Sequence, residues 1–300
     1  MTRDQRMKAR ILLNPAAGRG RAARSRAAVE RIARRFGAEV VESASPGELA
    51  ALARKSAAEG RERLLVAGGD GTYHHAAQGL ASSDCALVPI PFGTGNDLAR
   101  ELGLPLDPER AIEIGLEVPL ERMDLGRIGE RYFCGVAGSG LDSEAAEYSL
   151  SVRRLRGPLV YVWAVLAVIS RFRAPRLEIE LDGEKREGRV MLVAFANTRY
   201  FGGGMMIAPG ADRADGRLDV VQVREISRAV LLAVLPRVYR GAHLGHPAFS
   251  VVRASRIRLR FDREMACWGD GERLARIGPE GLVVEVAPGA LRVPRGGLDS

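Results

Sequence analysis

Lysine is scarce in this chain of 300 residues, although basic residues are common. Among the 45 lysines and arginines, only Lys8, Lys55 and Lys185 are lysines, and none lies in a Gly-Lys-Ser or Gly-Lys-Thr sequence. This absence excludes a P-loop, whose lysine contacts the β- and γ-phosphates of the nucleotide. It also excludes the protein-kinase arrangement, which requires a strand lysine and a His-Arg-Asp loop.

Cysteine, aromatic residues and long hydrophobic runs are also scarce. Cys85, Cys134 and Cys267 form no Cys-x-x-Cys pair, so we expect buried thiols in a reducing cytoplasm. Aromatic residues make up 5% of the chain, which argues against base stacking on single-stranded nucleic acid. The longest apolar run, residues 158–170, is too short to cross a bilayer and predicts a core helix or one wall of an apolar groove. We expect no signal peptide, because the charged N-terminus leads directly into a predicted strand.

The net charge of +8 indicates an anionic partner: a nucleotide, a nucleic acid or an acidic membrane. Arginines are concentrated in residues 19–35, which predict a helix with either a solvated face or a contact with phosphates or an anionic bilayer. Arg153, Arg154 and Arg156 directly precede the apolar run, and charge beside apolar residues is typical of a membrane interface. The predicted location is therefore cytoplasmic, with a peripheral contact at the inner membrane surface.

Hydrophobic patterning divides the chain into two predicted domains, residues 1–125 and 126–294. In the first, strands alternate with helices, which predicts an α/β domain with a parallel sheet. The predicted strands are residues 11–13, 39–41, 64–67 and 86–90, and the predicted helices are residues 21–36, 46–58, 72–81, 97–102 and 108–116. The second domain is predicted to be a mainly antiparallel β-sandwich, and its C-terminal segment could pack back on the first domain. Its predicted strands are residues 131–136, 176–181, 189–196, 218–223, 250–252, 256–261 and 281–286, and its predicted helices are residues 158–172 and 227–239.

A glycine-rich turn, Gly68-Gly69-Asp70-Gly71-Thr72, follows the predicted strand at residues 64–67 and precedes a predicted helix. Glycine allows backbone N–H groups to approach a polyphosphate, and a helix N-terminus favours negative charge. Asp70 would repel phosphate unless a proton or a metal lies between them, so we expect it to organise magnesium-bound phosphate; the alternative is that it caps the helix. Residues 14–18 and 92–97 form two further polar turns at the same sheet edge, where ligands of parallel sheets bind.

Four motifs occur in order: Asn14-Pro15-x-x-Gly18, the Gly68–Thr72 turn, Pro-Phe-Gly-Thr-Gly-Asn-Asp at residues 91–97, and Asp270-Gly271-Glu272. Together they resemble the diacylglycerol kinase catalytic family, which includes bacterial lipid kinases and sphingosine kinases. The resemblance implies an α/β nucleotide-binding domain, then a β-sandwich, with ATP and lipid meeting between them. It implies an ATP- and Mg²⁺-dependent kinase for a hydroxyl of a lipid such as diacylglycerol or a sphingoid base. Lipid identity and oligomeric state stay open.

The resemblance also implies roles for individual residues. Asp215 would donate a carboxylate to a structural Mg²⁺, and Asp212 and Arg217 would donate carbonyl oxygens, which suits a metal that prefers oxygen; a hairpin turn at Asp215-Gly216 is the alternative. The residues implied to contact ATP are Asn14, Pro15, Ala16, Ala17, Gly18, Ser43, Gly68, Gly69, Asp70, Gly71, Thr72 and Thr94.

Either Glu272 or Asp270 would accept the proton of the lipid hydroxyl, according to the same resemblance. The Asp-Gly pair also favours a type I′ hairpin, and both interpretations can be true. Asp142 is expected to contact the lipid head group, or alternatively to serve as a helix N-cap.

One departure from the family concerns His74-His75, where the family often has an Asn-Glu pair, so nucleotide preference stays open. An NAD kinase shares a turn of the Gly-Gly-Asp-Gly-Thr type, but that family lacks the Pro-Phe-Gly-Thr-Gly-Asn-Asp turn and the late Asp-Gly-Glu in this form. A nucleotide- or nucleic-acid-binding protein without catalysis is the third hypothesis, motivated by the positive charge. The preferred partners are a lipid substrate and an anionic membrane surface, not nucleic acid.

Overall fold

The first part of the chain forms a parallel four-stranded sheet. The computed structural model describes residues 9–151, 164 and 167–295. The strands are β1 (Ala9–Leu13), β2 (Glu39–Glu42), β3 (Arg63–Gly68) and β4 (Ala86–Pro91), in the order β2-β1-β3-β4. Every pairing is parallel, so the carboxyl ends of all four strands lie at one edge. The predicted α/β domain and its four strands are confirmed.

Helices cover both faces of this sheet because the strand side chains alternate between two hydrophobic cores. Ile11 and Leu65 point into the core beneath α2 and α6, whereas Leu12 and Val66 point into the core beneath α3 and α4. The helices are α1 (Ala17–Arg24), α2 (Arg26–Phe36), α3 (Pro46–Ala58), α4 (Asp70–Leu80), α5 (Asp97–Glu101) and α6 (Pro108–Glu117).

The single helix predicted over residues 21–36 is wrong. Two helices, α1 and α2, meet at Ser25, whose backbone dihedrals of φ −88° and ψ 2° are outside the helical region. The periodicity of the apolar residues does not reveal this interruption, because Ala22 lies in the same core as Val29 and Ile32.

The second part of the chain is a β-rich domain in which every described pairing is antiparallel. Its first strands are β5 (Leu120–Ile128), β6 (Arg131–Phe133), β7 (Val136–Gly140), β8 (Arg176–Leu181), β9 (Glu184–Ala196), β10 (Tyr200–Phe201) and β11 (Met205–Met206). The remaining strands are β12 (Leu218–Arg224), β13 (Phe249–Ala254), β14 (Arg256–Phe261), β15 (Met265–Gly269), β16 (Glu272–Ile277) and β17 (Leu282–Pro294). The helices are α7 (Leu141–Ser151), α9 (Arg228–Val238) and a 3₁₀ turn (Ala242–Gly245).

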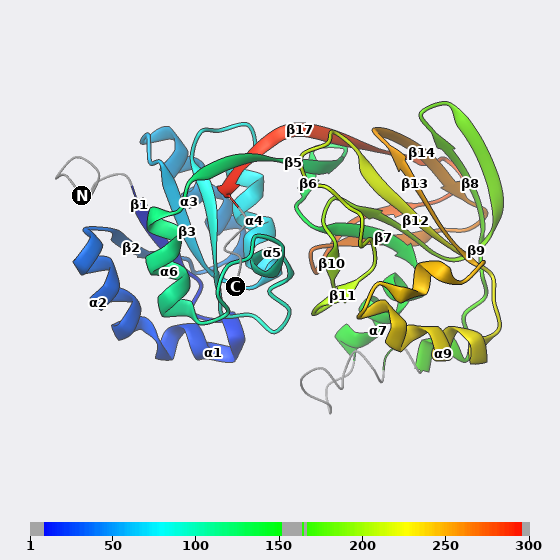
Figure 1. Cartoon of the computed structure of the whole chain (residues 1–300), viewed down its shortest axis with the longest axis horizontal. Coiled ribbons are helices and arrows are strands. Elements are labelled where there is room, and N and C mark those ends of the chain that lie inside the picture. Colours follow the sequence, from blue (N-terminus) through cyan, green and yellow to red (C-terminus); the bar gives the residue numbers. More distant parts are fainter. Residues whose placement is uncertain (1–8, 152–163, 165–166, 296–300) are drawn as a thin grey trace.

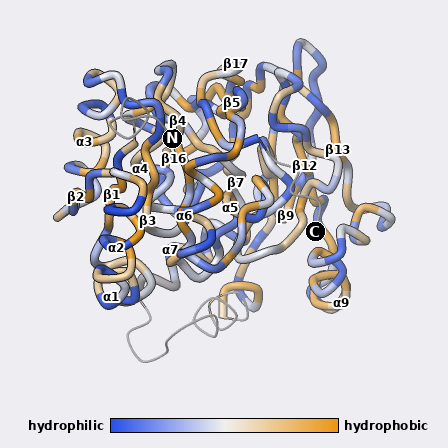
Figure 2. Tube along the Cα trace, turned by 60° about the vertical axis from the view of Figure 1, so that its left-hand side comes forward, coloured by the Kyte–Doolittle hydropathy of each residue, from blue (hydrophilic) through white to orange (hydrophobic). Residues whose placement is uncertain are grey.

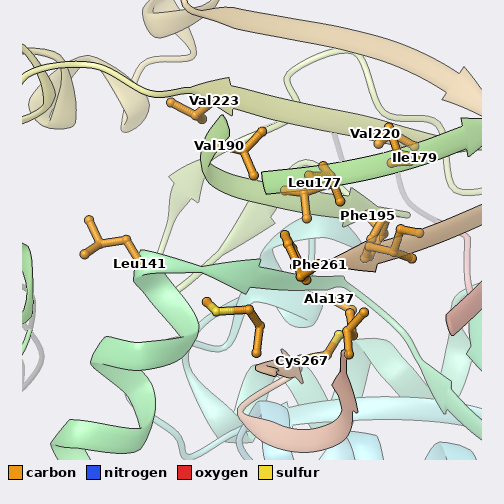
Figure 3. Close-up of a cluster of buried hydrophobic side chains, with 14 of the residues drawn as sticks. Ala137, Leu141, Leu177, Ile179, Val190, Phe195, Val220, Val223, Phe261 and Cys267 are labelled. Atoms are coloured by element: carbon orange, nitrogen blue, oxygen red, sulfur yellow. The ribbon is translucent and has the colours of Figure 1, made fainter. Parts of the chain in front are cut away.

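Two layers of this domain enclose a core, which confirms the predicted sandwich-like fold. Strand β9 joins the layers, because its first half pairs with β8 and its second half pairs with β7 and β12. Leu177, Ile179, Phe195 and Phe261 gather between the layers (Figure 3).

Some predictions for this domain were incomplete. The strand predicted over residues 131–136 is two strands, β6 and β7, separated at Cys134 and Gly135. Strands β5, β15 and β16 were missed, because β5 mixes charged and apolar residues and β15–β16 surround an Asp-Gly turn. The apolar helix predicted over residues 158–172 lies largely outside the described residues, as do Arg153, Arg154 and Arg156.

Strands β5 and β17 run side by side from the β-rich domain to the α/β domain (Figure 1). Met123, Leu125, Leu291 and Val293 are fully buried in the core that α3 and α4 cover. The last strand therefore contributes to the core of the first domain. In the hydropathy view (Figure 2), the polar stretches lie largely on the outside of both domains.

Candidate functional site

The three polar turns that follow β1, β3 and β4 lie against one another at the carboxyl edge of the parallel sheet. Asn14 Nδ2 donates to Thr72 Oγ1 at 3.1 Å, and Asn14 Oδ1 accepts from Ala16 N at 3.1 Å. The backbone N–H of Phe92 donates to Gly68 O at 2.7 Å, which attaches the third turn to the second. The predicted convergence of these turns is thus present in the structure.

Close backbone contacts explain why these turns are rich in glycine. A Cβ atom on Gly69 would lie 2.9 Å from the Cα atom of Gly93, and one on Gly68 would lie 2.3 Å from the Cβ of Thr72. Gly18 has a φ of +58°, and a Cβ there would lie 2.2 Å from the carbonyl oxygen of Phe92. Glycine permits this close packing because it has no Cβ atom.

Asp70 is the first residue of α4, and its carboxylate points away from its own helix. Asp70 Oδ1 accepts from the N–H of Leu98 at 3.3 Å, so the helix-cap alternative is wrong. Burial, followed by the neighbouring charge of Asp97, raises the pKa of Asp70 to about 7.

Asp97 was not among the predicted site residues, although it lies inside the Gly-Thr-Gly-Asn-Asp motif. Its two carboxylate oxygens accept from Gly203 N at 2.9 Å and Gly204 N at 2.7 Å, on the turn between β10 and β11. Burial raises the pKa of Asp97 as well. This carboxylate therefore connects the two domains beside Asp70.

Asp70 and Asp97 both face Gly95. A Cβ on Gly95 would lie 2.8 Å from Asp70 Oδ2 and 3.4 Å from Asp97 Oδ2. Kinase sites bind Mg²⁺ through one or two carboxylates and the substrate phosphates, so this donor set suits the ion. Over residues 9–151, 164 and 167–295, no group of three or more His, Cys, Asp or Glu side chains could hold a metal alone. The arrangement thus fits a site completed by phosphate oxygens.

The Asp270-Gly271 pair forms a type I′ hairpin between β15 and β16, as the hairpin interpretation predicted. Gly269 pairs with Glu272, and φ is +53° at Asp270 and +86° at Gly271. Asp270 accepts from Cys134 N at 2.7 Å and Gly135 N at 2.9 Å. These bonds explain the interruption between β6 and β7.

The same hairpin brings both candidate bases against α4. His74 Nδ1 lies 3.3 Å from Asp270 Oδ2, and His75 Nε2 lies 3.4 Å from Glu272 Oε1. Only 7% of the Asp270 side chain is exposed, compared with 42% of the Glu272 side chain. The neighbouring His75 imidazole holds the pKa of Glu272 below its usual value. Glu272 also lies beside the Gly68–Thr72 turn, since a Cβ on Gly71 would lie 3.2 Å from its Oε1.

The loop over residues 212–217 is anchored by Asp124, a buried residue of β5 that sequence reasoning missed. Asp124 Oδ2 accepts from Gly216 N and Asp124 Oδ1 accepts from Gly289 N, both at 2.7 Å. A hairpin at Asp215-Gly216 is wrong, because β12 pairs with β13 and β9 and not with the preceding strand.

The side chains of Asp212 and Asp215 accept hydrogen bonds from backbone N–H groups two residues further on, so each closes a local turn. Asp212 Oδ1 accepts from Ala214 N at 3.0 Å, and Asp215 Oδ1 accepts from Arg217 N at 2.9 Å. The second oxygen of Asp215 lies 3.7 Å from the guanidinium of Arg253. One carboxylate and backbone carbonyl oxygens are donors that Mg²⁺ accepts together with water.

Asp142 lies at an apolar pocket of about 170 Å³ in the β-rich domain. It is the second residue of α7, so the N-cap alternative is wrong. Burial raises its pKa to about 6. Among the described residues that line the pocket it has the only charged side chain. The others are Leu141, Ile169, Met191, Leu192, Phe201, Met205, Ile207, Val223, Leu231, Leu232, Val234, Leu235, Val238, Tyr239 and Phe249.

Two further residues that were predicted to contact ATP, Ser43 and Thr94, also lie at the carboxyl edge of the sheet. Ser43 is buried after β2, and its N–H donates to Leu13 O at 3.0 Å. Thr94 is exposed in the turn that follows β4.

Comparisons with known families cover both parts of the chain. Residues 8–128 match the diacylglycerol kinase catalytic domain, and residues 135–295 match the YegS C-terminal NAD kinase beta sandwich-like domain. A diacylglycerol kinase of Mycobacterium tuberculosis is 35% identical over 298 residues, which cover 96% of this chain and 95% of the relative. A diacylglycerol kinase of Bacillus subtilis is 29% identical over 271 residues, which cover 88% and 89%.

Solved structures show the same fold. A structure of a diacylglycerol kinase from Bacillus anthracis superposes with a TM-score of 0.72 at 20% identity and covers 96% of this chain and 97% of that chain. Because the identity is low, this likeness is informative about the fold alone.

Proposed function

Since this chain belongs to the diacylglycerol kinase family and is a lipid kinase, we propose that it transfers the γ-phosphoryl group of ATP to a lipid hydroxyl in a Mg²⁺-dependent reaction. Diacylglycerol or a sphingoid base is the proposed acceptor. One observation carries the proposal: the hairpin of the second domain places Glu272 against Gly71 of the Gly68–Thr72 turn, which is the proposed phosphate turn. The proposed proton acceptor therefore lies beside the proposed phosphate-binding turn.

ATP binds along the carboxyl edge of the parallel sheet in this proposal. The start of α4 supplies backbone N–H groups for the phosphates, and the turns that contain Asn14 and Gly69 lie beside it. Pro15, Ala16 and Ala17 continue the first turn, and Thr94 and Ser43 lie on neighbouring turns.

Asp70 is proposed to hold Mg²⁺ with the phosphate oxygens, and Asp97 is the second carboxylate within this site. The bound ion would neutralise charge on the phosphates. A pKa of about 7 for Asp70 supports this proposal, since a buried carboxylate beside another one is favoured in its charged form only when a cation is near. The second, structural Mg²⁺ is proposed at Asp215 with the carbonyl oxygens of Asp212 and Arg217.

Glu272 is proposed as the base, and Asp270 as a positioning residue. Asp270 already accepts from two backbone N–H groups and contacts His74, so most of its lone-pair sites are occupied. Glu272 is more exposed, and its lowered pKa keeps it ionised at neutral pH. It takes the proton of the lipid hydroxyl while the hydroxyl oxygen attacks the γ-phosphorus. The bond from that phosphorus to the bridging oxygen breaks, and ADP leaves.

The apolar pocket is proposed to bind the hydrophobic part of the lipid, with Asp142 at the polar head group. Apolar walls with one placed polar group are typical of small-molecule sites. Among the described residues, no helix is long and apolar enough to cross a membrane. We therefore propose that the enzyme works in the cytoplasm and contacts an anionic membrane transiently.

The test is incubation of the purified chain with radiolabelled ATP, Mg²⁺ and detergent micelles that contain diacylglycerol, sphingosine or extracted bacterial lipid. We expect label in the lipid extract with Mg²⁺ and none after chelation. Absence of labelled lipid with every acceptor would overturn the proposal. Phosphorylation of NAD in a parallel coupled assay would favour an NAD kinase instead.

A further inference from the structure

Helix α9 lies at the periphery of the β-rich domain (Figure 1) and carries an exposed apolar stripe. Leu232, Leu235 and Tyr239 have exposed fractions of 41%, 38% and 54%. Their spacings of three and four residues place them along one side of the helix. Within the described part of the chain, these are three of the five large hydrophobic side chains that are exposed. Most of the exposed large hydrophobic side chains in the described part of the chain therefore lie together in this stripe.

The stripe borders the apolar pocket. Val234 and Val238 face inward and are buried, and the three exposed residues contribute to the same pocket lining as Asp142. The pocket therefore opens beside the apolar side of α9. Anything that covers this side also covers the entrance.

Within residues 228–240, all charged side chains are positive. Residues 228–240 contain Arg228, Arg237 and Arg240 and no acidic residue. All three arginines are exposed, and none forms a salt bridge among the residues that the structure describes. An apolar stripe with arginines beside it is the pattern of a helix that lies in a membrane interface.

The arginines of α2 differ in this respect. Arg26 pairs with Glu30 and Glu42, Arg31 pairs with Glu109, and Arg35 pairs with Glu113. These exposed ion pairs offset the positive charge of that helix, and it has no exposed apolar stripe. Its solvated-face interpretation thus agrees with the observed contacts.

We propose that residues 228–240 dock on the surface of an anionic bilayer, so that the lipid passes from the bilayer into the pocket without crossing water. This inference rests on the proposed lipid-kinase function, and it adds the surface through which the enzyme meets its substrate. The apolar stripe enters the acyl boundary, the tyrosine lies at the head groups, and the arginines contact lipid phosphates.

A second copy of the chain is a poorer occupant of this face. A two-fold dimer brings identical patches together, so the three arginines would face the same three arginines. Neither copy offers a carboxylate within residues 228–240 to balance them. An anionic bilayer supplies the missing negative charge.

The first test places a probe on the stripe. Cys85, Cys134 and Cys267 are buried, so a cysteine introduced by Leu232→Cys can be labelled selectively with an environment-sensitive fluorophore. We expect a blue-shifted emission with vesicles of phosphatidylcholine and phosphatidylglycerol, and little change with phosphatidylcholine alone. Leu106→Cys is the matched control, because Leu106 is 42% exposed on the other domain. If the protein sediments with anionic vesicles while the probe at position 232 does not shift, the proposal is wrong.

The second test removes the charges. The double variant Arg237→Gln, Arg240→Gln should weaken partitioning onto anionic vesicles about 30-fold, or about fivefold for each arginine. Neither residue lines the pocket, so phosphorylation of a short-chain lipid in micelles should persist. The control is Arg110→Gln, Arg258→Gln, which removes two exposed arginines elsewhere and should keep most of the binding. Equal loss of binding in both double variants would overturn the proposal.

The third test removes the apolar contact. Leu232→Gln, Leu235→Gln should reduce vesicle binding about tenfold, because less apolar surface leaves water. Binding is measured without ATP, so a protein that binds vesicles but transfers no phosphate would contradict the proposed reaction and leave the docking surface intact. A dimer of the unmodified chain that this double variant dissociates would show that the face binds a second copy instead.

Discussion

His74 Nδ1 lies 3.3 Å from Asp270 Oδ2, although 196 positions separate the two residues in the sequence. His74 belongs to the helix that begins at the phosphate turn, and Asp270 belongs to the hairpin that carries Glu272. Both side chains are buried, with exposed fractions of 4% and 7%. The contact therefore fixes the distance between the proposed phosphate site and the proposed base.

Replacement of His74 should loosen this connection. We expect His74→Ala to lower the free energy of unfolding by about 2 kcal/mol, which is typical for loss of a buried hydrogen bond to a charged group. The value of kcat should fall by about tenfold, because the hairpin is less well positioned. Urea unfolding and steady-state kinetics measure the two effects. His246→Ala is the control, since His246 lies away from the hairpin, where its ring accepts from Ala248 N and packs edge-on against Phe249; an equal effect in the control would contradict this role.

The two carboxylates of the hairpin should behave differently. Glu272→Gln should lower kcat by about 10²- to 10⁴-fold, as expected for loss of a general base, with little change in the urea midpoint. Asp270→Asn should also destabilise the fold by about 1–3 kcal/mol, because an amide nitrogen cannot accept from Cys134 N or Gly135 N. If Asp270→Asn were fully stable and inactive while Glu272→Gln stayed active, the assignments would be reversed.

The glycine turns and the strands that precede them could be predicted from the sequence, because each signal is local. The run Leu64-Leu65-Val66-Ala67 is apolar, and the glycines that follow it mark close backbone approach. Contacts between the domains have no such signal. Asp97 bonds to Gly203 and Gly204 of the β10–β11 turn, which lie 106 and 107 positions further along the sequence.

The burial of individual side chains could also not be predicted from residue type. Asp124 looks like an ordinary charged residue of a strand, yet it is buried and bonds to Gly216 and Gly289 on two distant segments. Ion pairs with Glu30, Glu42, Glu109 and Glu113 partly offset the positive charge of α2, and such pairing could not be predicted from the sequence. The exposed apolar side of α9 could not be distinguished from its buried side by periodicity, because the buried residues Val234 and Val238 are apolar as well.

Asp70 should make stability depend on pH and on Mg²⁺. Its pKa is raised from 3.8 to about 7 in the folded chain, so the stability it contributes is fully present below pH 3.8 and is lost as the pH rises through 7. Asp70→Asn avoids this loss, and its free energy of unfolding should exceed that of the unmodified chain by up to about 4 kcal/mol at pH 8 without metal. Thermal unfolding across pH 4–8 measures the difference.

Mg²⁺ should reduce the difference in stability between the unmodified chain and Asp70→Asn. At pH 8, Mg²⁺ with a non-hydrolysable ATP analogue should raise the melting temperature of the unmodified chain more than that of Asp70→Asn, because both proteins keep the proposed site at Asp215 and only the unmodified chain keeps the Asp70 carboxylate. Asp262→Asn, on the exposed surface, is the control and should respond to Mg²⁺ like the unmodified chain. An equal response of all three proteins would exclude Asp70 as a ligand.

Asp142 should affect the lipid and not the nucleotide. We expect Asp142→Asn to raise KM for the lipid by about tenfold and to leave KM for ATP unchanged, because one charge-assisted hydrogen bond is lost. Its pKa is about 6 in the folded chain, so the stability it contributes is present below pH 3.8 and is lost as the pH rises through 6. The variant should therefore be more stable than the unmodified chain at pH 8. A changed KM for ATP would indicate that the pocket serves the nucleotide.

Gly95 should be intolerant of any side chain for a chemical reason and not because of backbone strain. The φ of Gly95 is outside the left-handed region, but an added Cβ would lie 2.8 Å from Asp70 Oδ2, between the two carboxylates. We expect Gly95→Ala to fold and to lose activity by about 100-fold, because phosphate and metal are displaced from Asp70. Gly47→Ala is the matched control, since a Cβ there meets nothing within 4 Å. Retention of full activity by Gly95→Ala, with a circular dichroism spectrum like that of the control, would mean that the space between Asp70 and Asp97 is not where the phosphates bind.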